Sequence, residues 1–315
     1  MIYTVNGPVE TSNFGNILMH EHIGCISNDL MHTFNKKWLD KEKLTDFAAD
    51  ILEKLKLKYD LGMFVDGTPI DVGRDISMIK TVSIRSGVQI VASTGLYHYP
   101  SMYTCNHSES EIATWFIDEF ENGMEGTDIK PGILKIASDY CGITKDNEKR
   151  LSAIAIAQNE TSLPLYVHSV HSSGLVEQQL KILFRNITYP EKIIIGHVAL
   201  KPEIEYVERI LDTGCYICMD QCHCSDQSAE TIAKTLVALC EKGYANKIML
   251  SNDMCIYSDF GTRNNTGFHL TPEEQLYNFG YIFNMVYKSF IENNGSEKDW
   301  TIMFKQNPVK VLDVR

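Results

Sequence analysis

The sequence has few features that would tie it to a membrane or to nucleic acid. None of its apolar runs approaches the roughly 18 residues that a membrane-spanning helix needs. The N-terminus has no basic region followed by an apolar core, so it does not resemble a signal peptide. With 29 Lys and Arg against 41 Asp and Glu, the net charge is −12, and such a surface repels phosphate backbones. We therefore expect no nucleic-acid or membrane partner.

The sequence also lacks the marks of a disulfide scaffold, a linker or a disordered segment. Its nine cysteines are an odd number scattered through 315 residues, which favours reduced thiols and a cytoplasmic location. Hydrophobic residues make up 44% and charged residues 22%, as in an average globular chain. Because no Pro-, Gly- or Ser-rich stretch divides the chain, we expect one domain over residues 1–315.

Short apolar segments alternate with longer amphipathic ones along the whole chain. The expected strands are Asn16–His22, Met63–Asp66, Gln89–Ser93, Ile133–Ala137, Leu165–His168, Ile193–His197, Tyr216–Met219 and Ile248–Asp253. Helical spacing or capping residues favour helices at Asp40–Lys58, from Ser108 onward, and at Asp146–Thr161, Gly174–Phe184, Glu203–Leu211, Ser228–Lys242, Pro272–Glu292 and from Asn307. Eight strands that each precede a helix predict a single (β/α)8 TIM barrel, although periodicity alone leaves open a doubly wound sheet.

Four histidines and one aspartate fall at the carboxyl ends of the expected strands. His20 and His22 close the first strand and, two residues apart, point to the same face. His168 ends the fifth strand, His197 the sixth and Asp253 the eighth. Barrel active sites lie at this end, so the five side chains should converge there. Any one of them could be a structural residue or a helix cap, but the ordered set predicts a metal site for Zn, Fe, Mn or Co.

Lys135 lies within the apolar run of the fourth strand, where an unpaired ammonium group is costly to bury. It could pair with an acid inside the barrel or extend to the barrel rim. Beside the five candidate ligands, we favour a lysine that CO2 has carboxylated, whose new carboxylate bridges two metal ions.

These motifs together resemble the phosphotriesterase family of the amidohydrolase superfamily, and its lactonase-like members most of all. The resemblance covers essentially the whole chain and rests on an ordered set of short motifs. They are Met19-His-Glu-His22, Thr94-Gly-Leu-Tyr97, Lys135 in its apolar strand, Tyr166-Val-His168, Ile195-Gly-His197, Leu250-Ser-Asn-Asp253 and Asn307-Pro308.

The resemblance implies a binuclear metal-dependent hydrolase, with zinc as the expected metal and a homodimer as the expected assembly. His20, His22 and Asp253 would hold the more buried cation, and His168 and His197 the more exposed one. Carboxylated Lys135 and a hydroxide would bridge the two cations. The hydroxide would attack the substrate, and Asp253 would pass its proton to the leaving group.

The resemblance also bears on the small-molecule substrate. Tyr97 matches a tyrosine with which the family's lactonases bind a lactone oxygen, although it could simply pack at the rim. Organophosphate-hydrolysing members carry relay groups where this chain has no acid after His197 and has Gln221 in place of a histidine. We therefore expect a lactone, including a sugar lactone, or a small carboxylic ester. Arg263 and His171 are weaker candidates for substrate contact.

Other interpretations remain open at this point. A true phosphotriesterase, a metal-dependent nuclease and a barrel that binds metal without catalysis are all compatible with the ligand pattern. Cys215-Tyr-Ile-Cys218 and Cys222-His-Cys224 look like a metal cluster. However, strand residues three apart face opposite sides, so we expect Cys215 and Cys218 to be buried thiols that share no metal.

Overall fold

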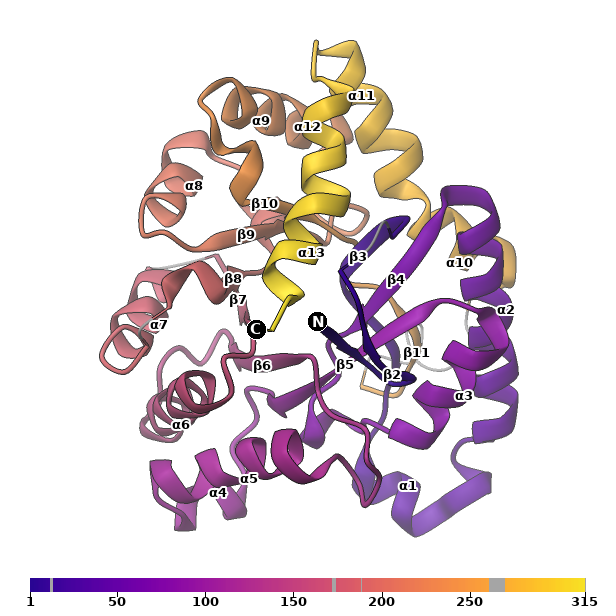
Figure 1. Ribbon diagram of the computed structural model, residues 1–315, viewed down its shortest axis with the longest axis vertical. Coiled ribbons are helices and arrows are strands. Elements are labelled where there is room, and N and C mark those ends of the chain that lie inside the picture. The colour runs from indigo at the N-terminus through magenta and orange to yellow at the C-terminus, as the bar shows by residue number, and fades with distance from the viewer. Residues whose placement is uncertain (12–13, 172–173, 188, 261–269, 315) are drawn as a thin grey trace.

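A curled sheet of nine parallel strands forms the centre of the protein (Figure 1). The computed structural model describes residues 1–11, 14–171, 174–187, 189–260 and 270–314. Most strands are buried along their whole length, which explains their uninterrupted apolar sequences. The strands, in sheet order, are β10 (Ile248–Leu250), β9 (Tyr216–Met219), β8 (Ile193–Ile195), β7 (Leu165–Ser169), β6 (Ile133–Ser138), β5 (Gln89–Leu96), β4 (Leu61–Asp66), β3 (Asn16–Cys25) and β11 (Cys255–Ser258).

The segment expected to form the eighth strand is split in two, and its two halves close the barrel. β10 pairs with β9, whereas β11 pairs with the first barrel strand, β3. Between them the chain leaves regular strand geometry, and the buried carboxylate of Glu21 accepts hydrogen bonds from the backbone N–H groups of Asn252 and Met254, both at 2.7 Å. The prediction of a (β/α)8 barrel is therefore confirmed, but the expected eighth strand ends at Leu250 because Glu21 holds the following residues in a turn.

Helices surround the sheet, and most begin close to the positions that the sequence indicates. Asp40 caps α2, and Ser108 with Glu111 forms the predicted capping box of α5. The helices are α1 (Asn28–Phe34), α2 (Lys41–Tyr59), α3 (Ile76–Ser86), α4 (Met102–Asn106), α5 (Glu109–Asn122), α6 (Lys145–Thr161), α7 (Leu175–Leu183), α8 (Ile204–Leu211), α9 (Ala229–Glu241), α10 (Pro272–Phe279), α11 (Tyr287–Glu292), α12 (Glu297–Thr301) and α13 (Asn307–Leu312).

Several parts of the chain differ from the expectation. The first expected strand, Asn16–His22, continues as β3 to Cys25, so His20 and His22 lie within the strand and do not close it. The stretch Pro272–Glu292 is not one regular α-helix, because α10 ends at Phe279 and a π-helical segment, Ile282–Val286, precedes α11. Near the N-terminus, β1 (Ile2–Thr4) and β2 (Gly7–Val9) form an antiparallel hairpin that the strand pattern did not predict. Helices α1, α3, α4 and α12 were also missed.

Apolar side chains fill the barrel interior at the end opposite the candidate histidines. Inward-facing side chains such as Ile17, Met63 and Ile194 form a compact apolar cluster that also includes Val311 and Leu312 of α13. Both chain termini lie near the barrel axis at this end (Figure 1). Between the sheet and the helices lies a larger apolar layer. Within the described residues, no helix combines the length and the apolar character needed to cross a membrane.

Candidate metal centre

The first three candidate ligands meet where the barrel closes. His20 and His22 lie on one face of β3 with their ring centroids 5.0 Å apart. Oδ1 of Asp253 lies 3.1 Å from Nε2 of His22 and 3.5 Å from Nδ1 of His20. Asp253 adopts a left-handed backbone conformation, with φ of 56°, in the turn between β10 and β11. The split in the eighth strand therefore brings this carboxylate to the two histidines.

The other candidates lie beside this group. Nδ1 of His168 is 2.6 Å from Nε2 of His197, and both rings are buried. His197 follows β8 with a φ of 61°, a conformation that few residues other than glycine adopt. Nζ of Lys135 contacts Nε2 of His20 and lies 4.6 Å from the ring centroid of Tyr166. The structure thus brings all six predicted metal-centre residues into one buried cluster.

Burial favours the uncharged forms of three of these groups. It lowers the pKa of His20 to about 3, and burial together with the neighbouring His197 ring lowers the pKa of His168 to about 3. Burial also lowers the pKa of Lys135 to about 8. A neutral imidazole has a free lone pair, so the two histidines are ready to bind a cation.

Asp220 is the principal residue that the sequence analysis missed. Its side chain is fully buried just after β9 and holds two candidate ligands at once, with Nδ1 of His20 at 2.8 Å from Oδ2 and Nδ1 of His197 at 3.1 Å from Oδ1. The Tyr166 hydroxyl donates a third hydrogen bond. A carboxylate accepts and cannot donate, so it holds the proton of each ring on Nδ1 and leaves Nε2 free. Its place at a strand end was the available signal.

Two further polar residues contact the cluster from loops. Asp139, directly after β6, lies 3.7 Å from Nε2 of His168 and 3.3 Å from Nε2 of His98, and its contact with His168 lowers its pKa to about 2. Gln221 occupies the position at which we expected a histidine in an organophosphate-hydrolysing member of the family. Its amide donates a 2.6 Å hydrogen bond to Oδ2 of Asp253, so it orients that carboxylate with a group that does not titrate.

The cluster fits divalent cations. Nδ1 of His168 and Nε2 of His197 face each other, and Asp220 holds the other nitrogen of His197. Two ring nitrogens that face each other in this way are expected where two rings share one cation. His20, His22 and Asp253 likewise offer ligand atoms within 4.8 Å of one another. Nitrogen and carboxylate donors suit zinc, manganese, cobalt and iron alike.

The candidate substrate residues have different surroundings. The ring of Tyr97 packs edge-on against His168, with centroids 5.2 Å apart, at the half-buried rim of the cluster. His171 is buried away from this face, because its ring nitrogens are occupied by the Tyr206 hydroxyl at 2.8 Å and the Gly196 carbonyl at 2.7 Å. Arg263 lies outside the described residues.

The cysteine-rich segment is not a metal cluster in the part of the chain that the structure describes. Cys215, Cys218 and Cys222 are buried, and none of them belongs to a group of three potential ligands among the described residues. Burial raises the pKa of Cys215 to about 11, as expected for an unreactive thiol. The prediction of buried thiols at Cys215 and Cys218 is confirmed.

A parallel barrel that gathers imidazoles and carboxylates at the carboxyl ends of its strands is an arrangement that metal-dependent hydrolases use. The sequence profile described as "Phosphotriesterase family" matches residues 1–312, and the chain belongs to that family.

Individual relatives agree with this assignment. An aryldialkylphosphatase of Saccharolobus solfataricus is 33% identical over 96% of both chains. An N-acetyltaurine hydrolase of Homo sapiens is 26% identical over 69% of this chain and 70% of its own. The solved structure of a phosphotriesterase from Mycobacterium tuberculosis superposes with a TM-score of 0.90 at 26% identity, covering 99% of this chain and 98% of that one.

Proposed function

We propose that this protein is a binuclear metal-dependent hydrolase that opens a lactone or cleaves a small carboxylic ester. The observation that supports this substrate class best is the position of Tyr97, whose ring rests against the candidate ligand His168. Its backbone is held on both sides, since its N–H donates to Asp71 at 2.8 Å and its carbonyl accepts from Arg150 at 2.7 Å. A phenol fixed in this way can present a hydrogen-bond donor to a substrate oxygen.

The candidate ligands divide into two groups in this proposal. His20, His22 and Asp253 would hold one cation, and His168 and His197 the other. Lys135, carboxylated by CO2, would contribute a carboxylate shared by both. When bound, two divalent cations would lower the pKa of a water molecule and polarise the substrate carbonyl.

The protein's own side chains have separate tasks in the reaction. Asp253 accepts the proton that is released on attack and delivers it to the leaving alkoxide, while Gln221 keeps Oδ2 of this carboxylate oriented. Burial raises the pKa of Tyr97, so its hydroxyl stays protonated and donates to the substrate. Asp220 keeps the His20 and His197 rings in the tautomer that binds metal.

Phosphotriester hydrolysis is the second candidate, and the relative named an aryldialkylphosphatase favours it. The residues near the site argue for the carboxylic ester. Gln221 cannot accept a proton from Asp253, and the turn after His197 continues with the apolar Val198 and Ala199. A group that relays protons at either place would better suit an organophosphate hydrolase.

The test is a hydrolysis screen of the protein reconstituted with zinc or manganese. The panel contains sugar lactones with and without a phosphate, aliphatic lactones, a simple ester and one aryl dialkyl phosphate, followed with a pH indicator. We expect lactone or ester turnover that collapses in Asp253→Asn and persists in the surface control Asp118→Asn. Turnover of the phosphotriester alone would refute the substrate class and leave the metal centre in place. Silence in protein that holds two metal ions would refute the activity.

Three expectations about the assembled protein remain proposals. We propose zinc as the cation, a carbamate on Lys135 and a homodimer. Elemental analysis of the purified protein, intact mass measured under non-acidic conditions and light scattering test them in turn.

A further inference from the structure

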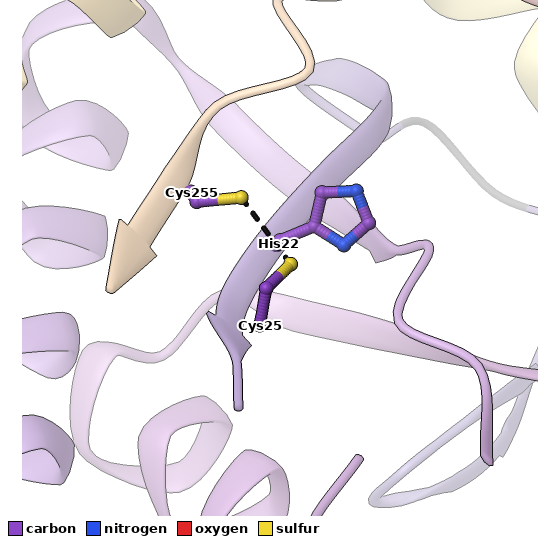
Figure 2. A group of neighbouring side chains, drawn as sticks. All are labelled: His22, Cys25 and Cys255. Atoms are coloured by element: carbon purple, nitrogen blue, oxygen red, sulfur yellow. Dashed lines mark hydrogen bonds between the residues drawn. The ribbon is translucent and has the colours of Figure 1, made fainter. Parts of the chain in front are cut away.

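Two cysteines meet next to the candidate metal centre, outside the ligand set described above. Sγ of Cys25 lies 3.3 Å from Sγ of Cys255. Each sulfur lies within 4.8 Å of the other and of one ring nitrogen of His22, so the three ligand atoms surround a single point (Figure 2). Cys25 is the last residue of β3 and Cys255 the first of β11, which places the pair where the barrel closes.

The local geometry departs from the usual strand pattern. His22 and Cys25 are three residues apart, a spacing that would place them on opposite faces of a regular strand. At this end of β3 they nevertheless turn toward the same point (Figure 2). Cys255 pairs with His22 across the sheet, so its side chain joins the same face. The convergence therefore follows from the irregular end of β3 and from the pairing of β11.

The two ring nitrogens of His22 face different neighbours, one the candidate metal centre and the other the two cysteines. Nε2 lies 3.1 Å from Asp253 and belongs to the candidate metal centre. Nδ1 lies 2.9 Å from the hydroxyl of Thr68. Figure 2 shows one nitrogen turned toward the cysteines and the other turned away. Since Nε2 faces Asp253, the nitrogen on the sulfur side is Nδ1.

We propose that Cys25, Cys255 and Nδ1 of His22 form a third cation site, selective for thiophilic cations such as Zn²⁺ and Cd²⁺. Two thiolates and one imidazole are a ligand set that such cations favour, and three protein ligands leave a fourth position open. With Zn–S bonds of about 2.3 Å, a tetrahedral site holds two sulfurs about 3.8 Å apart, so the pair needs to widen by only about half an ångström. Because Nε2 of His22 serves the metal centre, Nδ1 carries the proton of the neutral ring. Binding therefore releases this proton together with the two thiol protons, leaves the ring as an imidazolate between the two sites, and displaces the hydrogen bond to Thr68.

The surroundings of the pair allow a cation to enter. Cys25 is 8% exposed, whereas Cys255 keeps a larger part of its surface open. Because the ring of His22 lies between this position and the metal centre, a cation bound here fixes the orientation of a candidate ligand of that centre. The site would thus connect the supply of thiophilic metal to the geometry of the hydrolytic centre.

A cadmium titration of the full-length protein tests the proposal. Two quantities are measured, namely the ultraviolet charge-transfer absorption of cadmium–thiolate bonds and the number of ions bound per chain. We expect three ions and a charge-transfer band in the unmodified protein. Cys25→Ser and Cys255→Ser should bind two ions and lose the band. The matched control Cys240→Ser, on α9, should keep both.

Three results would overturn the proposal: two ions and no band in the unmodified protein, a band that persists in either variant, or mass analysis that finds Cys25 and Cys255 joined as a disulfide. A variant that still binds two ions has kept the metal centre and is therefore folded. If a serine variant does not fold, Cys255→Ala takes its place, since removal of either cysteine should abolish the site. Because no readout depends on hydrolysis, failure of the proposed function and failure of this site are distinguishable.

Discussion

The buried carboxylate of Asp220 offers the sharpest test of how the metal centre is organised. Asp220→Asn preserves the shape of the side chain but replaces one carboxylate oxygen with an N–H donor. Around it stand hydrogen-bond donors only, namely Nδ1 of His20 at 2.8 Å, Nδ1 and the backbone N–H of His197, and the Tyr166 hydroxyl. An amide group therefore leaves at least one of these donors facing another donor.

The size of the effect follows from the number of ligands involved. Hydrogen bonds to a charged group contribute about 1.5–3 kcal/mol each, and Asp220 orients one ligand of each proposed cation. Loss of such a partner typically lowers metal affinity about 10- to 100-fold, which corresponds to about 1.4–2.8 kcal/mol. We expect Asp220→Asn to weaken zinc binding by this factor.

The assay is a competition between the protein and a chelator of known affinity, read as the fraction of zinc that the protein retains. Asp212→Asn provides the matched control, because Asp212 is an exposed aspartate that accepts a hydrogen bond from Tyr244. The control should retain zinc like the unmodified protein. If Asp220→Asn also did so, the carboxylate would not set the orientation of the histidines and our account of the centre would be wrong.

Three further predictions concern the framework around the site, and urea denaturation measures each of them. Gly95→Ala places a Cβ 1.8 Å from the carbonyl oxygen of Lys135 at a φ of 136°, so we expect the free energy of unfolding to fall by more than about 3 kcal/mol. The control Gly126→Ala has open space around the new Cβ at a φ of 73° and should lower it by only about 1–2 kcal/mol. Equal losses would refute the steric argument. Arg150→Met removes a buried guanidinium that pairs with Asp146 at 2.6 Å and donates to the Tyr97 carbonyl, and it should cost about 3–5 kcal/mol of stability. The control Arg185→Met breaks an exposed pair with Glu148 and should change stability by under about 0.5 kcal/mol. A small effect at Arg150 would mean that its buried ion pair does not stabilise the fold. Burial alone would raise the pKa of Asp75, but Lys41 and the backbone N–H of Met78 hold this pKa below its ordinary value. The carboxylate therefore stabilises the fold above about pH 3.9, and this contribution is lost as the pH falls toward the lowered pKa. Asp75→Asn should therefore reduce the difference in stability between pH 7 and pH 3, and an unchanged difference would contradict this reasoning.

The sequence predicted the parts of this molecule in which local pattern and global position agree. Apolar residues at consecutive positions, as in Ile193–Ile195, occur in strands that are buried on both faces, and those strands were located within a few residues. A polar residue near the end of an apolar strand likewise predicted a position in the site, because the carboxyl ends of parallel strands meet at one end of a barrel. His20, His22, His168, His197 and Asp253 all lie at the carboxyl end of the sheet, as expected.

What the sequence could not reveal depends on pairings between distant residues. Asp220 follows a strand just as the candidate ligands do, but its role arises from contacts with rings 200 and 23 residues away. The contact between Cys25 and Cys255 spans 230 residues, and Cys25 departs from strand alternation because it turns toward the same point as His22. The interrupted eighth strand likewise depends on Glu21, whose carboxylate reaches across the seam to residues more than 230 positions later.

The split of the eighth strand has a consequence for the order of events in folding. His22 and Asp253 are 231 residues apart, and they meet only when β11 has added to β3 and shut the barrel. Contacts of such long range form late, because the loop-closure entropy must be overcome before they stabilise the chain. The proposed cation position at His20, His22 and Asp253 is therefore absent from every partly folded intermediate in which the seam is open. Uptake of that cation would require the closed seam and would shift the equilibrium toward the closed form by mass action.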